Sequence, residues 1–304
     1  MEINGVYIDE TYAEAFGAYA GRVLITACSK TWAQEAARSM AGFGTSVIGC
    51  GCEVAIEAIE PADTPDDRPG VSVLLFAMSK KAVQEQLINR IGQCVMTAPT
   101  SACYNALEAE DRLSIGGKLK FFGDGFQISK RLDQRITGNG SSPRRFWRIP
   151  VMDGEFIVED RFGVKKGVAG GNFLLLGREL PETLQAAERA IEAMRKVPGV
   201  IMPFPGGVVR SGSKVGSRYK FLNASSNTAF CPSLRRAVKS ELPEGVGAVL
   251  EIVIDGLTPE AVGEAMRVGI RAACGPGIVK ISAGNYGGKL GKHHFHLHQL
   301  LADS

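Results

Sequence analysis

The chain has 304 residues, of which 45% are hydrophobic, enough to bury a large core in one large domain or in two lobes. Its 35 basic and 32 acidic residues nearly balance, so the overall charge gives no case for nucleic acid as a partner. The first residues show no basic region followed by an apolar core, and no apolar run reaches the roughly 20 residues that cross a bilayer. We therefore expect a cytoplasmic protein with no membrane contact.

The first half of the chain shows the periodicity of strands and amphipathic helices in the order βαββαβ. The predicted elements are a strand over Arg22–Ala27, a helix capped by Thr31 with Trp32, Ala36, Met40 and Phe43 on one face, strands over Thr45–Ile48 and Val71–Ala77, a helix capped by Ser79 with Val83, Leu87, Ile88 and Ile91 buried, and a strand over Cys94–Thr97.

The second half repeats this order. The predicted elements are a strand over Phe173–Leu176, a helix over Pro181–Lys196 with Leu184, Ala187, Ile191 and Met194 inward, strands over Val200–Phe204 and Ala248–Ile254, a helix opened by Thr258-Pro259-Glu260, and a strand over Ile278–Ser282. Sliding one half onto the other aligns Ser79 with Thr258. We predict an α+β fold of two ferredoxin-like βαββαβ lobes related as a pseudo-repeat.

Between the predicted lobes, three segments alternate as in an extended hairpin: Lys118–Phe122, Phe126–Ile136 and Arg144–Val151, with a turn at Gly138-Asn139-Gly140. The basic residues of the last segment flank Phe146 and Trp147, and could grip RNA or an anionic ligand, or form a subunit contact or hairpin strand. We place the boundary near residue 150. Residues 1–150 would form an N-terminal lobe with a hairpin extension, and residues 151–304 a C-terminal lobe with substrate loops.

Two glycine-rich loops, Pro203–Phe221 and Lys280–Lys292, each follow a short apolar run and mix glycine with Ser, Asn, Tyr and Lys. Such loops can close their backbone amides on an oxygen-rich or amide-bearing ligand. Neither has the spacing of a nucleotide-binding Walker loop. The alternative is that the glycines serve only turn geometry.

Glu251 is the most informative residue, because every neighbour in Val249–Ile254 is aliphatic. Alternation puts its carboxylate on the same face as Val249 and Val253, where burial would raise its pKa toward the range of general acid and base catalysis. The alternative is an edge strand with Glu251 in solvent. The aligned position of the first half is Ser72, so the fold itself does not require a carboxylate here.

All four histidines lie in the tail Lys292–His298, and alternation places His294, His296 and His298 on one strand face. Three histidines on one face could bind zinc, but no carboxylate or cysteine is interleaved with them. We favour an interface or a solvated edge.

Several long segments resemble the formylmethanofuran:tetrahydromethanopterin formyltransferase family. They are SGSK from Ser211, YKFL from Tyr219, FCPS from Phe230, ISAGNYGGKLGK from Ile281, MEINGV from Met1, TYAEAF from Thr11, RVLITA from Arg22, RIGQCV from Arg90 and KLKFF from Lys118. The resemblance covers nearly the whole chain, but the extra histidines of the tail depart from the family pattern.

This resemblance implies an acyltransferase that moves a formyl group between the amine of methanofuran and N5 of tetrahydromethanopterin, in the one-carbon metabolism of methylotrophs or methanogens, without a metal or prosthetic group. It implies that Glu251 acts in proton transfer. We expect loop amides with Ser211, Ser213 or Asn285 to stabilise the oxyanion, and Lys214, Lys289 and Lys292 to hold anionic tails. Asn172, Tyr219 and Tyr286 complete the predicted substrate-binding set.

The alternative function is a non-catalytic subunit that binds pterin or scaffolds a larger formyl-processing complex. The resemblance implies a homo-oligomer, a dimer or tetramer, and bacterial relatives in a formyltransferase/hydrolase complex. Hydrolase subunits are therefore expected partners. An RNA-binding module is disfavoured, because the aromatic strand pattern of such modules is missing.

Overall fold

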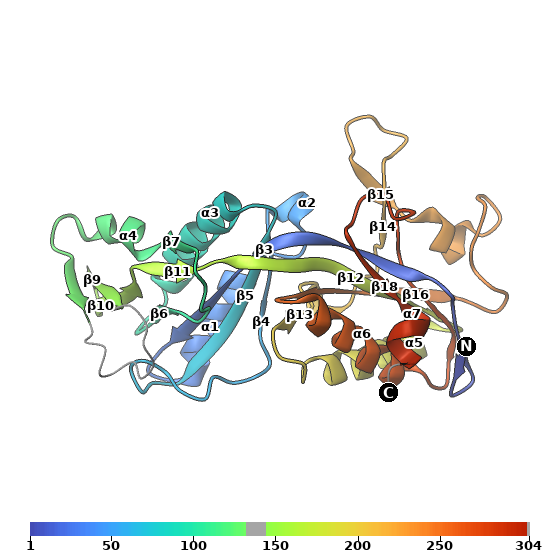
Figure 1. The fold of residues 1–304 in the computed structure, drawn as a ribbon, viewed down its shortest axis with the longest axis horizontal. Coiled ribbons are helices and arrows are strands. Elements are labelled where there is room, and N and C mark those ends of the chain that lie inside the picture. The colour runs from blue at the N-terminus through green and yellow to red at the C-terminus, as the bar shows by residue number, and fades with distance from the viewer. Residues whose placement is uncertain (132–143, 303–304) are drawn as a thin grey trace. The chain divides into compact units, whose positions relative to one another are not determined.

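The computed structural model describes residues 1–131 and 144–302, which form a mixed α/β fold with a large, mostly antiparallel sheet (Figure 1). The chain divides into two compact units. Unit 1 contains Met1–Gly17 and Val168–Ser304, and unit 2 contains Ala18–Gly167. The predicted mixture of helices with an antiparallel sheet is confirmed at this level.

The elements of unit 2 follow the order of the first predicted lobe, with an added group of strands. After the second part of β3 (Tyr12–Thr26), they are α1 (Lys30–Ala41), α2 (Val47–Cys50), β4 (Glu53–Ile56), β5 (Gly70–Ala77), α3 (Lys80–Arg90) with a π-helical turn over Ile91–Val95, β6 (Ala102–Asn105), β7 (Arg112–Ser114), α4 (Gly116–Leu119) with a 3-10 turn over Lys120–Gly123, β8 (Ile128–Arg131), β9 (Arg145–Val151), β10 (Gly154–Glu159) and β11 (Arg161–Gly163).

The first helix of unit 2 starts earlier than predicted and buries a different face. Its cap is Ser29, whose hydroxyl accepts from the N–H of Trp32, rather than Thr31. Trp32 and Phe43 are 43% and 79% exposed, so the predicted buried stripe was wrong at both aromatics. Small residues let this helix pack closely on the sheet, and the buried face consists of Ala33, Ala36, Ala37 and Met40.

Three predicted strand segments of unit 2 are helical. Thr45–Ile48 runs into α2, Cys94–Thr97 overlaps the π-helical turn, and Lys118–Phe122 lies in α4 and the turn after it. Short apolar runs do not distinguish a strand from a buried helical turn, which explains these errors. The strand Val71–Ala77 and the Ser79 cap are confirmed, and the Ser79 hydroxyl accepts from the N–H of Ala82.

The hairpin extension is present in part. β8 and β9 pair antiparallel, with Ile128 opposite Arg148, while the predicted turn at Gly138-Asn139-Gly140 lies outside the described residues. The arginine-rich segment is thus a hairpin strand, one of the alternatives above. The boundary predicted near residue 150 falls inside unit 2, at the end of β9 where Pro150 pairs with Glu155 of β10, and the division of the chain at this point stays a prediction.

Unit 1 combines the N-terminal residues with the second half of the chain. Besides the first part of β3, its elements are β1 (Glu2–Ile3), β2 (Val6–Ile8), the second part of β12 (Lys165–Gly177), α5 (Leu180–Met194), β13 (Val200–Ile201), a 3-10 turn over Pro205–Gly207, β14 (Ser213–Val215), β15 (Ala224–Ser226), 3-10 turns over Thr228–Phe230 and Pro232–Leu234, β16 (Ala248–Gly256), α6 (Pro259–Ala273), β17 (Ile278–Ser282), β18 (His293–His296) and α7 (Leu297–Ala302).

The second-half predictions hold closely except at Val200–Phe204, where the strand β13 covers only Val200–Ile201. The strand Ile278–Ser282 is confirmed, and Thr258 caps α6 by accepting from the N–H of Ala261. On α5 the predicted inward Leu184 is 40% exposed, whereas the other three predicted positions are buried.

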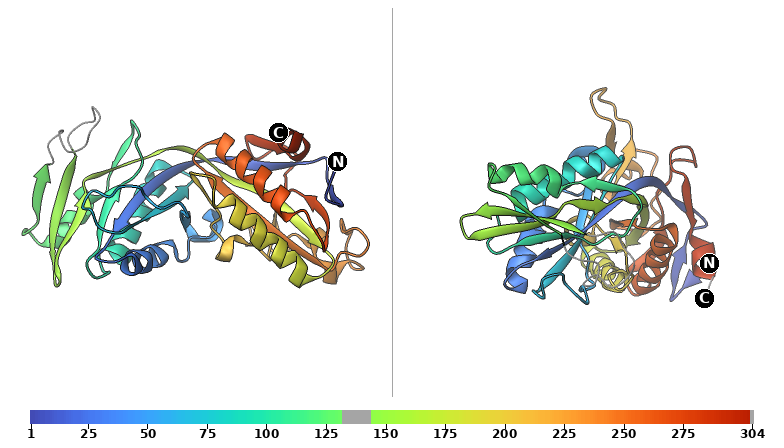
Figure 2. Two further views of the ribbon diagram at one scale, coloured as in Figure 1. Left: turned by 90° about the horizontal axis from the view of Figure 1, so that it is seen from below. Right: turned by 60° about the vertical axis from the view of Figure 1, so that its left-hand side comes forward.

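In unit 1, α5 and α6 pack side by side against one face of the sheet (Figure 2). The sheet order there is β17-β12-β16-β13, and in unit 2 the corresponding strands follow β6-β3-β5-β4. If the four strands of each unit are numbered one to four along the chain, the order across the sheet is 4-1-3-2 in both units. The helices bury the even-numbered residues of β16, so its odd-numbered residues face the opposite side of the sheet.

Candidate active site

A pocket of about 680 Å³ opens on the face of the unit 1 sheet that the two helices leave uncovered. Three strands form its floor. In the ladder Leu174 of β12 lies opposite Glu251 of β16 on one side and Ser282 of β17 on the other. These side chains share a face with Asn172 and Val249, which also line the pocket.

Glu251 lies inside the sheet rather than at its edge. β16 pairs with β12 on one side, and on the other the backbone of Glu251 exchanges hydrogen bonds of 2.8 and 2.9 Å with Val209. The edge-strand alternative is therefore wrong. The backbone of Gly212 also closes on the carboxylate, because a Cβ added there would lie 3.0 Å from Glu251 Oε2.

Burial raises the pKa of Glu251 from its ordinary 4.5 to about 7. Within residues 1–131 and 144–302, no hydrogen bond or ion pair to the carboxylate offsets this loss of hydration. A carboxyl group that titrates near neutral pH can both accept a proton from one reacting group and return it to another. The predicted chemistry of Glu251 is thus supported by its surroundings.

The loop after β13 forms one wall of the pocket. Arg210, Ser211, Ser213 and Lys214 line it, and both serine side chains are exposed to some degree. Lys214 Nζ donates to Thr228 Oγ1 at 3.1 Å. The structure therefore brings three predicted substrate-binding residues, and one cation that the prediction omitted, to the same wall.

The loop after β17 forms the opposite wall. Two asparagine side chains at this wall already make hydrogen bonds within the chain. Asn172 holds the loop through Gly284, accepting from its N–H at 2.6 Å and donating to its carbonyl at 3.2 Å. Asn285 Nδ2 donates to Thr11 Oγ1 and to the carbonyl of Tyr12. Both side chains line the pocket, but their amides already serve as anchors for the loop.

Two predicted substrate-binding residues do not line the pocket. Tyr219 lies in the arm between β14 and β15, which stands away from the rest of unit 1 in Figure 1, and its side chain is 64% exposed. Its ring lies 5.8 Å from that of Phe221. Lys289 is exposed, following two glycines with positive φ.

Glu14 is the principal residue that the prediction missed. Its side chain is fully buried, and its two oxygens accept from the N–H groups of Tyr286, Gly288, Leu290 and Gly291. Burial alone would raise the pKa of Glu14, but these four donors together lower it to about 2. The expectation that this loop's amides close on the oxyanion is thus wrong for these four. An acidic residue between Ala13 and Ala15 was the available signal.

The N-terminal segment supplies further lining residues that the prediction placed in the other lobe. β2 pairs parallel with β17, with Tyr7 opposite Lys280, and Asp9 forms a 2.7 Å ion pair with Lys280 Nζ. Tyr7, Asp9, Glu10 and Thr11 therefore reach the pocket wall. No local pattern in residues 1–17 indicates this long-range pairing.

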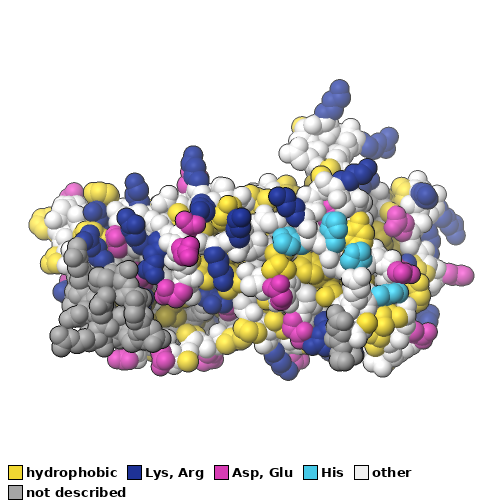
Figure 3. Space-filling view, viewed as in Figure 1, with side chains coloured by type: hydrophobic (Ala, Val, Ile, Leu, Met, Phe, Trp, Pro, Cys, Tyr) yellow, Lys and Arg dark blue, Asp and Glu magenta, His cyan; other side chains and the backbone are white. Residues whose placement is uncertain are grey.

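The histidines gather on one face of the molecule (Figure 3). The rings of His294 and His296 lie 5.0 and 5.1 Å from the Tyr12 ring. His298 belongs to α7 rather than to the predicted strand face, and its Nε2 lies 2.9 Å from the carbonyl oxygen of Ile8. Among residues 1–131 and 144–302, no three His, Cys, Asp or Glu side chains are placed to hold a metal ion.

In the described part of the chain no helix is both long and apolar enough to cross a membrane.

Comparison with known proteins covers nearly the whole chain. The model of the formylmethanofuran-tetrahydromethanopterin formyltransferase family matches residues 1–151, and that of its proximal lobe matches residues 154–300. The formylmethanofuran–tetrahydromethanopterin formyltransferase of Methylococcus capsulatus is 56% identical over 99% of this chain and 100% of its own length.

Two solved structures are similar along their full length. The formyltransferase/hydrolase complex of Methylorubrum extorquens with methylofuran contains a chain that is 48% identical, with a TM-score of 0.94 over 99% of this chain and 98% of that one. The formyltransferase of Methanosarcina barkeri is 49% identical, with a TM-score of 0.90 over 99% and 100%. This chain therefore belongs to the formylmethanofuran–tetrahydromethanopterin formyltransferase family and is itself a formyltransferase.

Proposed function

We propose that the unit 1 pocket is where this enzyme moves the formyl group between the amine of methanofuran and N5 of tetrahydromethanopterin, with Glu251 carrying the proton. The observation that carries the proposal is a carboxyl group with a pKa of about 7 on the floor of a pocket of about 680 Å³. That volume lies within the range of small-molecule sites.

In the proposed step the nitrogen of one carrier attacks the formyl carbon, a new C–N bond forms, and the carbonyl oxygen becomes an oxyanion. Glu251 accepts the proton of the attacking nitrogen. The C–N bond to the other carrier then breaks, and Glu251 returns the proton to the leaving nitrogen, so that atoms and charges balance. The hydroxyls of Ser211 and Ser213, which line the pocket, would donate to ligand oxygens.

Cationic side chains at the pocket support a role in holding anionic parts of the carriers. Lys214 and Arg210 lie on the wall, and we retain Lys289 and Lys292 as exposed residues of the neighbouring loop for the same role. Tyr219 would contact a substrate only beyond the pocket, along the arm.

We interpret the two halves as ferredoxin-like repeats, which their shared strand order supports. The position aligned with Glu251 is Ser72, whose hydroxyl donates to Glu57 at 2.6 Å within unit 2. Among the described residues, therefore, only the second repeat has a carboxylate at this position, and that carboxylate lines the pocket. The acid-base function would be an addition to one copy of a common fold.

The alternative of a non-catalytic scaffold is not favoured, because relatives similar over the full length are named as the enzyme. A relative from Methylorubrum extorquens is one of the subunits of a formyltransferase/hydrolase complex, which supports hydrolase subunits as partners. A dimer or tetramer, a cytoplasmic location and transfer without a metal or prosthetic group stay predictions.

The test is formyl exchange between N5-formyl-tetrahydromethanopterin and methanofuran, followed optically and by product mass. Glu251→Gln should lower kcat by about 10²–10⁴-fold while both KM values change little, since the amide keeps the shape but cannot carry the proton. Glu244→Gln, an exposed site of the same unit, is the control. Near-normal kcat in Glu251→Gln would overturn the assignment. Exchange that requires companion subunits would make the chain a partner-dependent enzyme.

A further inference from the structure

The loop from Ala283 to Gly291 is built around an internal carboxylate. Four of its N–H groups donate to Glu14, at 2.6 Å from Tyr286, Leu290 and Gly291 and at 2.8 Å from Gly288. Each carboxylate oxygen receives two of them. A charged acceptor makes such bonds about twice as strong as those between neutral groups, so Glu14 fixes the path of the whole loop.

The glycines of this loop fit that arrangement. Gly287 and Gly288 have φ of 70° and 72°, which glycine adopts without steric cost, and they turn the loop so that the N–H of Gly288 donates to Glu14 while that of Gly287 donates to Asn285 Oδ1. At Gly291, a Cβ would lie 2.8 Å from Glu14 Cγ and 2.5 Å from the carbonyl oxygen of Ala15. The glycines thus serve the approach of the backbone to Glu14.

The same loop carries Tyr286 to the pocket. Its own N–H is one of the four donors, and its ring lies 5.9 Å from that of Phe16, two residues after Glu14 in β3. Tyr286 lines the pocket together with Glu251. Burial, followed by the charges of Glu251 and Glu14, raises the pKa of Tyr286, so its phenol keeps the proton and can donate a hydrogen bond.

We propose that the Tyr286 hydroxyl is a catalytic group that donates to the formyl oxygen beside Glu251, and that Glu14 is the positioning residue that holds Tyr286 there. Tyr286 keeps its proton throughout, and the oxyanion is stabilised by the hydrogen bond alone. This inference rests on the proposed function of the pocket. It adds one donor to the reaction and accounts for a buried charge, Glu14, that is not among the residues lining the pocket.

The test is a double-mutant cycle in the exchange assay, with kcat and both KM values measured for Tyr286→Phe, Glu14→Gln and the double variant. Tyr286→Phe keeps the ring and removes only the hydroxyl, and should lower kcat by about 10²-fold, as for other oxyanion donors. Glu14→Gln should also lower kcat, because its amide group meets N–H donors. If Glu14 acts through Tyr286, the double variant should be little worse than Tyr286→Phe alone.

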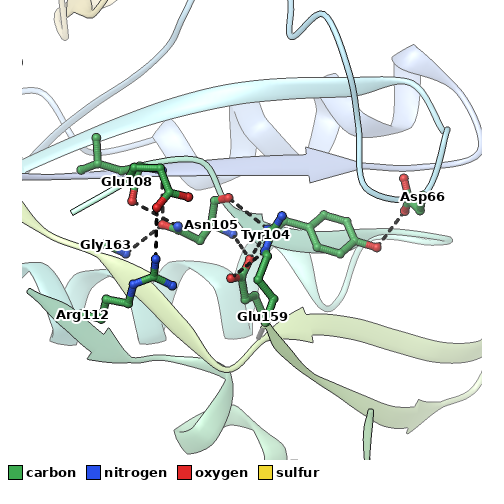
Figure 4. A network of polar contacts seen from close by, with 9 residues as sticks. Asp66, Tyr104, Asn105, Glu108, Arg112, Glu159 and Gly163 are labelled. Atoms are coloured by element: carbon green, nitrogen blue, oxygen red, sulfur yellow. Dashed lines mark hydrogen bonds and ion pairs between the residues drawn. The ribbon is translucent and has the colours of Figure 1, made fainter. Parts of the chain in front are cut away.

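Glu159→Gln is the matched control. Glu159 is another buried carboxylate, which accepts from the N–H of Asn105 and from Arg144. Figure 4 shows Glu159 and Asn105 in the polar network of unit 2. The variant Glu159→Gln should lower thermal stability as Glu14→Gln does, but leave kcat unchanged. Equal loss of kcat in Glu159→Gln and Glu14→Gln would mean that Glu14 affects kcat only through the general stability of the protein.

Gly288→Ala replaces Glu14→Gln if the latter does not fold, since it strains the loop at φ 72° and retains the carboxylate. It should lower kcat in the wild-type background and have little effect beside Tyr286→Phe. Wild-type kcat in Tyr286→Phe, or losses that simply multiply in the double variant, would overturn the inference. Glu251→Gln in the same assay keeps failure of the proposed function separate: a normal Glu251→Gln would refute that function whatever Tyr286 does.

Discussion

Glu251 and Glu14 show how two glutamates of one unit acquire opposite acidities. Both are withdrawn from water, which disfavours a charged carboxylate. Burial raises the pKa of Glu251 to about 7, and the described residues offer its oxygens no donor that would offset this, whereas four backbone donors bring the pKa of Glu14 to about 2. The first can exchange a proton at neutral pH, and the second remains a fixed negative charge.

The pKa of Glu251 predicts how transfer depends on pH. A base must be ionised to accept the proton of the attacking nitrogen, so kcat/KM should rise as pH increases through about 7 and then level off. A pH profile of the wild type and of Glu251→Gln measures this. The inflection should disappear in the variant; its persistence there would assign it to another group.

The same pKa predicts an effect on stability. The folded pKa is raised from 4.5 to about 7, so the folded state binds the proton more tightly, and stability falls as pH rises between these values. Glu251→Gln should therefore be more stable than the wild type at pH 8, by on the order of 3 kcal/mol, since one pKa unit is about 1.4 kcal/mol. Urea unfolding at pH 8 and pH 4 tests this. An equal gain in stability at pH 8 and pH 4 would have a cause other than the raised pKa of Glu251.

At the scale of elements, the pocket consists of a rigid sheet floor and two loops that depend on close backbone approach. The wall at Gly212 contacts Glu251, and the wall at 283–291 surrounds Glu14. Loops on a fixed scaffold are where binding residues concentrate, because the scaffold sets their position.

Gly212→Ala should perturb Glu251 directly. The added Cβ would lie 3.0 Å from the carboxylate, so either the loop or the Glu251 side chain must move by a few tenths of an ångström. We expect kcat to fall by about tenfold with little loss of stability, because small misplacements of a proton carrier are costly to rate. Gly49→Ala is the control, since a Cβ there meets nothing within 4 Å. An active Gly212→Ala would show that the wall adapts.

The 283–291 loop should loosen in acid. The folded pKa of Glu14 is lowered from 4.5 to about 2, so its contribution to stability is complete above 4.5 and disappears as pH falls to 2. The stability difference between the wild type and Glu14→Gln should shrink over this range, as measured by urea unfolding at several pH values. A constant difference would mean that Glu14 stabilises the fold by packing alone.

At the scale of the whole molecule, the N-terminal residues belong to unit 1 with the second half of the chain. Val6 and Ile8 are buried in its core, and β2 extends its sheet beside β17. A division of the chain at residue 150 would separate Glu14 from the loop that it holds.

A fragment of residues 154–304 should therefore not fold cooperatively. The loss of Val6 and Ile8 alone removes about 3–6 kcal/mol of stabilising free energy, because burying one such side chain contributes about 1.5–3 kcal/mol. A typical total free energy of unfolding is about 5–15 kcal/mol. Circular dichroism during thermal unfolding of the fragment, beside the full chain, measures this. A sharp transition in the fragment would show that unit 1 needs no N-terminal segment.

Local pattern was enough for much of this protein. The alternation around Glu251 fixed the face of its carboxylate, the caps at Ser79 and Thr258 located two helices, and the family motifs identified the enzyme. Each of these depends on residues close together in sequence. Patterns of the same kind failed at Thr45–Ile48 and Cys94–Thr97, where short apolar runs suit strand and helix equally.

Only the tertiary structure decided which donors of the site are free. Glu14 lies 272 to 277 residues before the amides that it binds, and the amide groups of Asn172 and Asn285 are used to anchor the loop. Backbone N–H groups are the same in every residue except proline, so no sequence pattern shows which acceptor they meet. That choice is made when β3 and the glycine loop pack together.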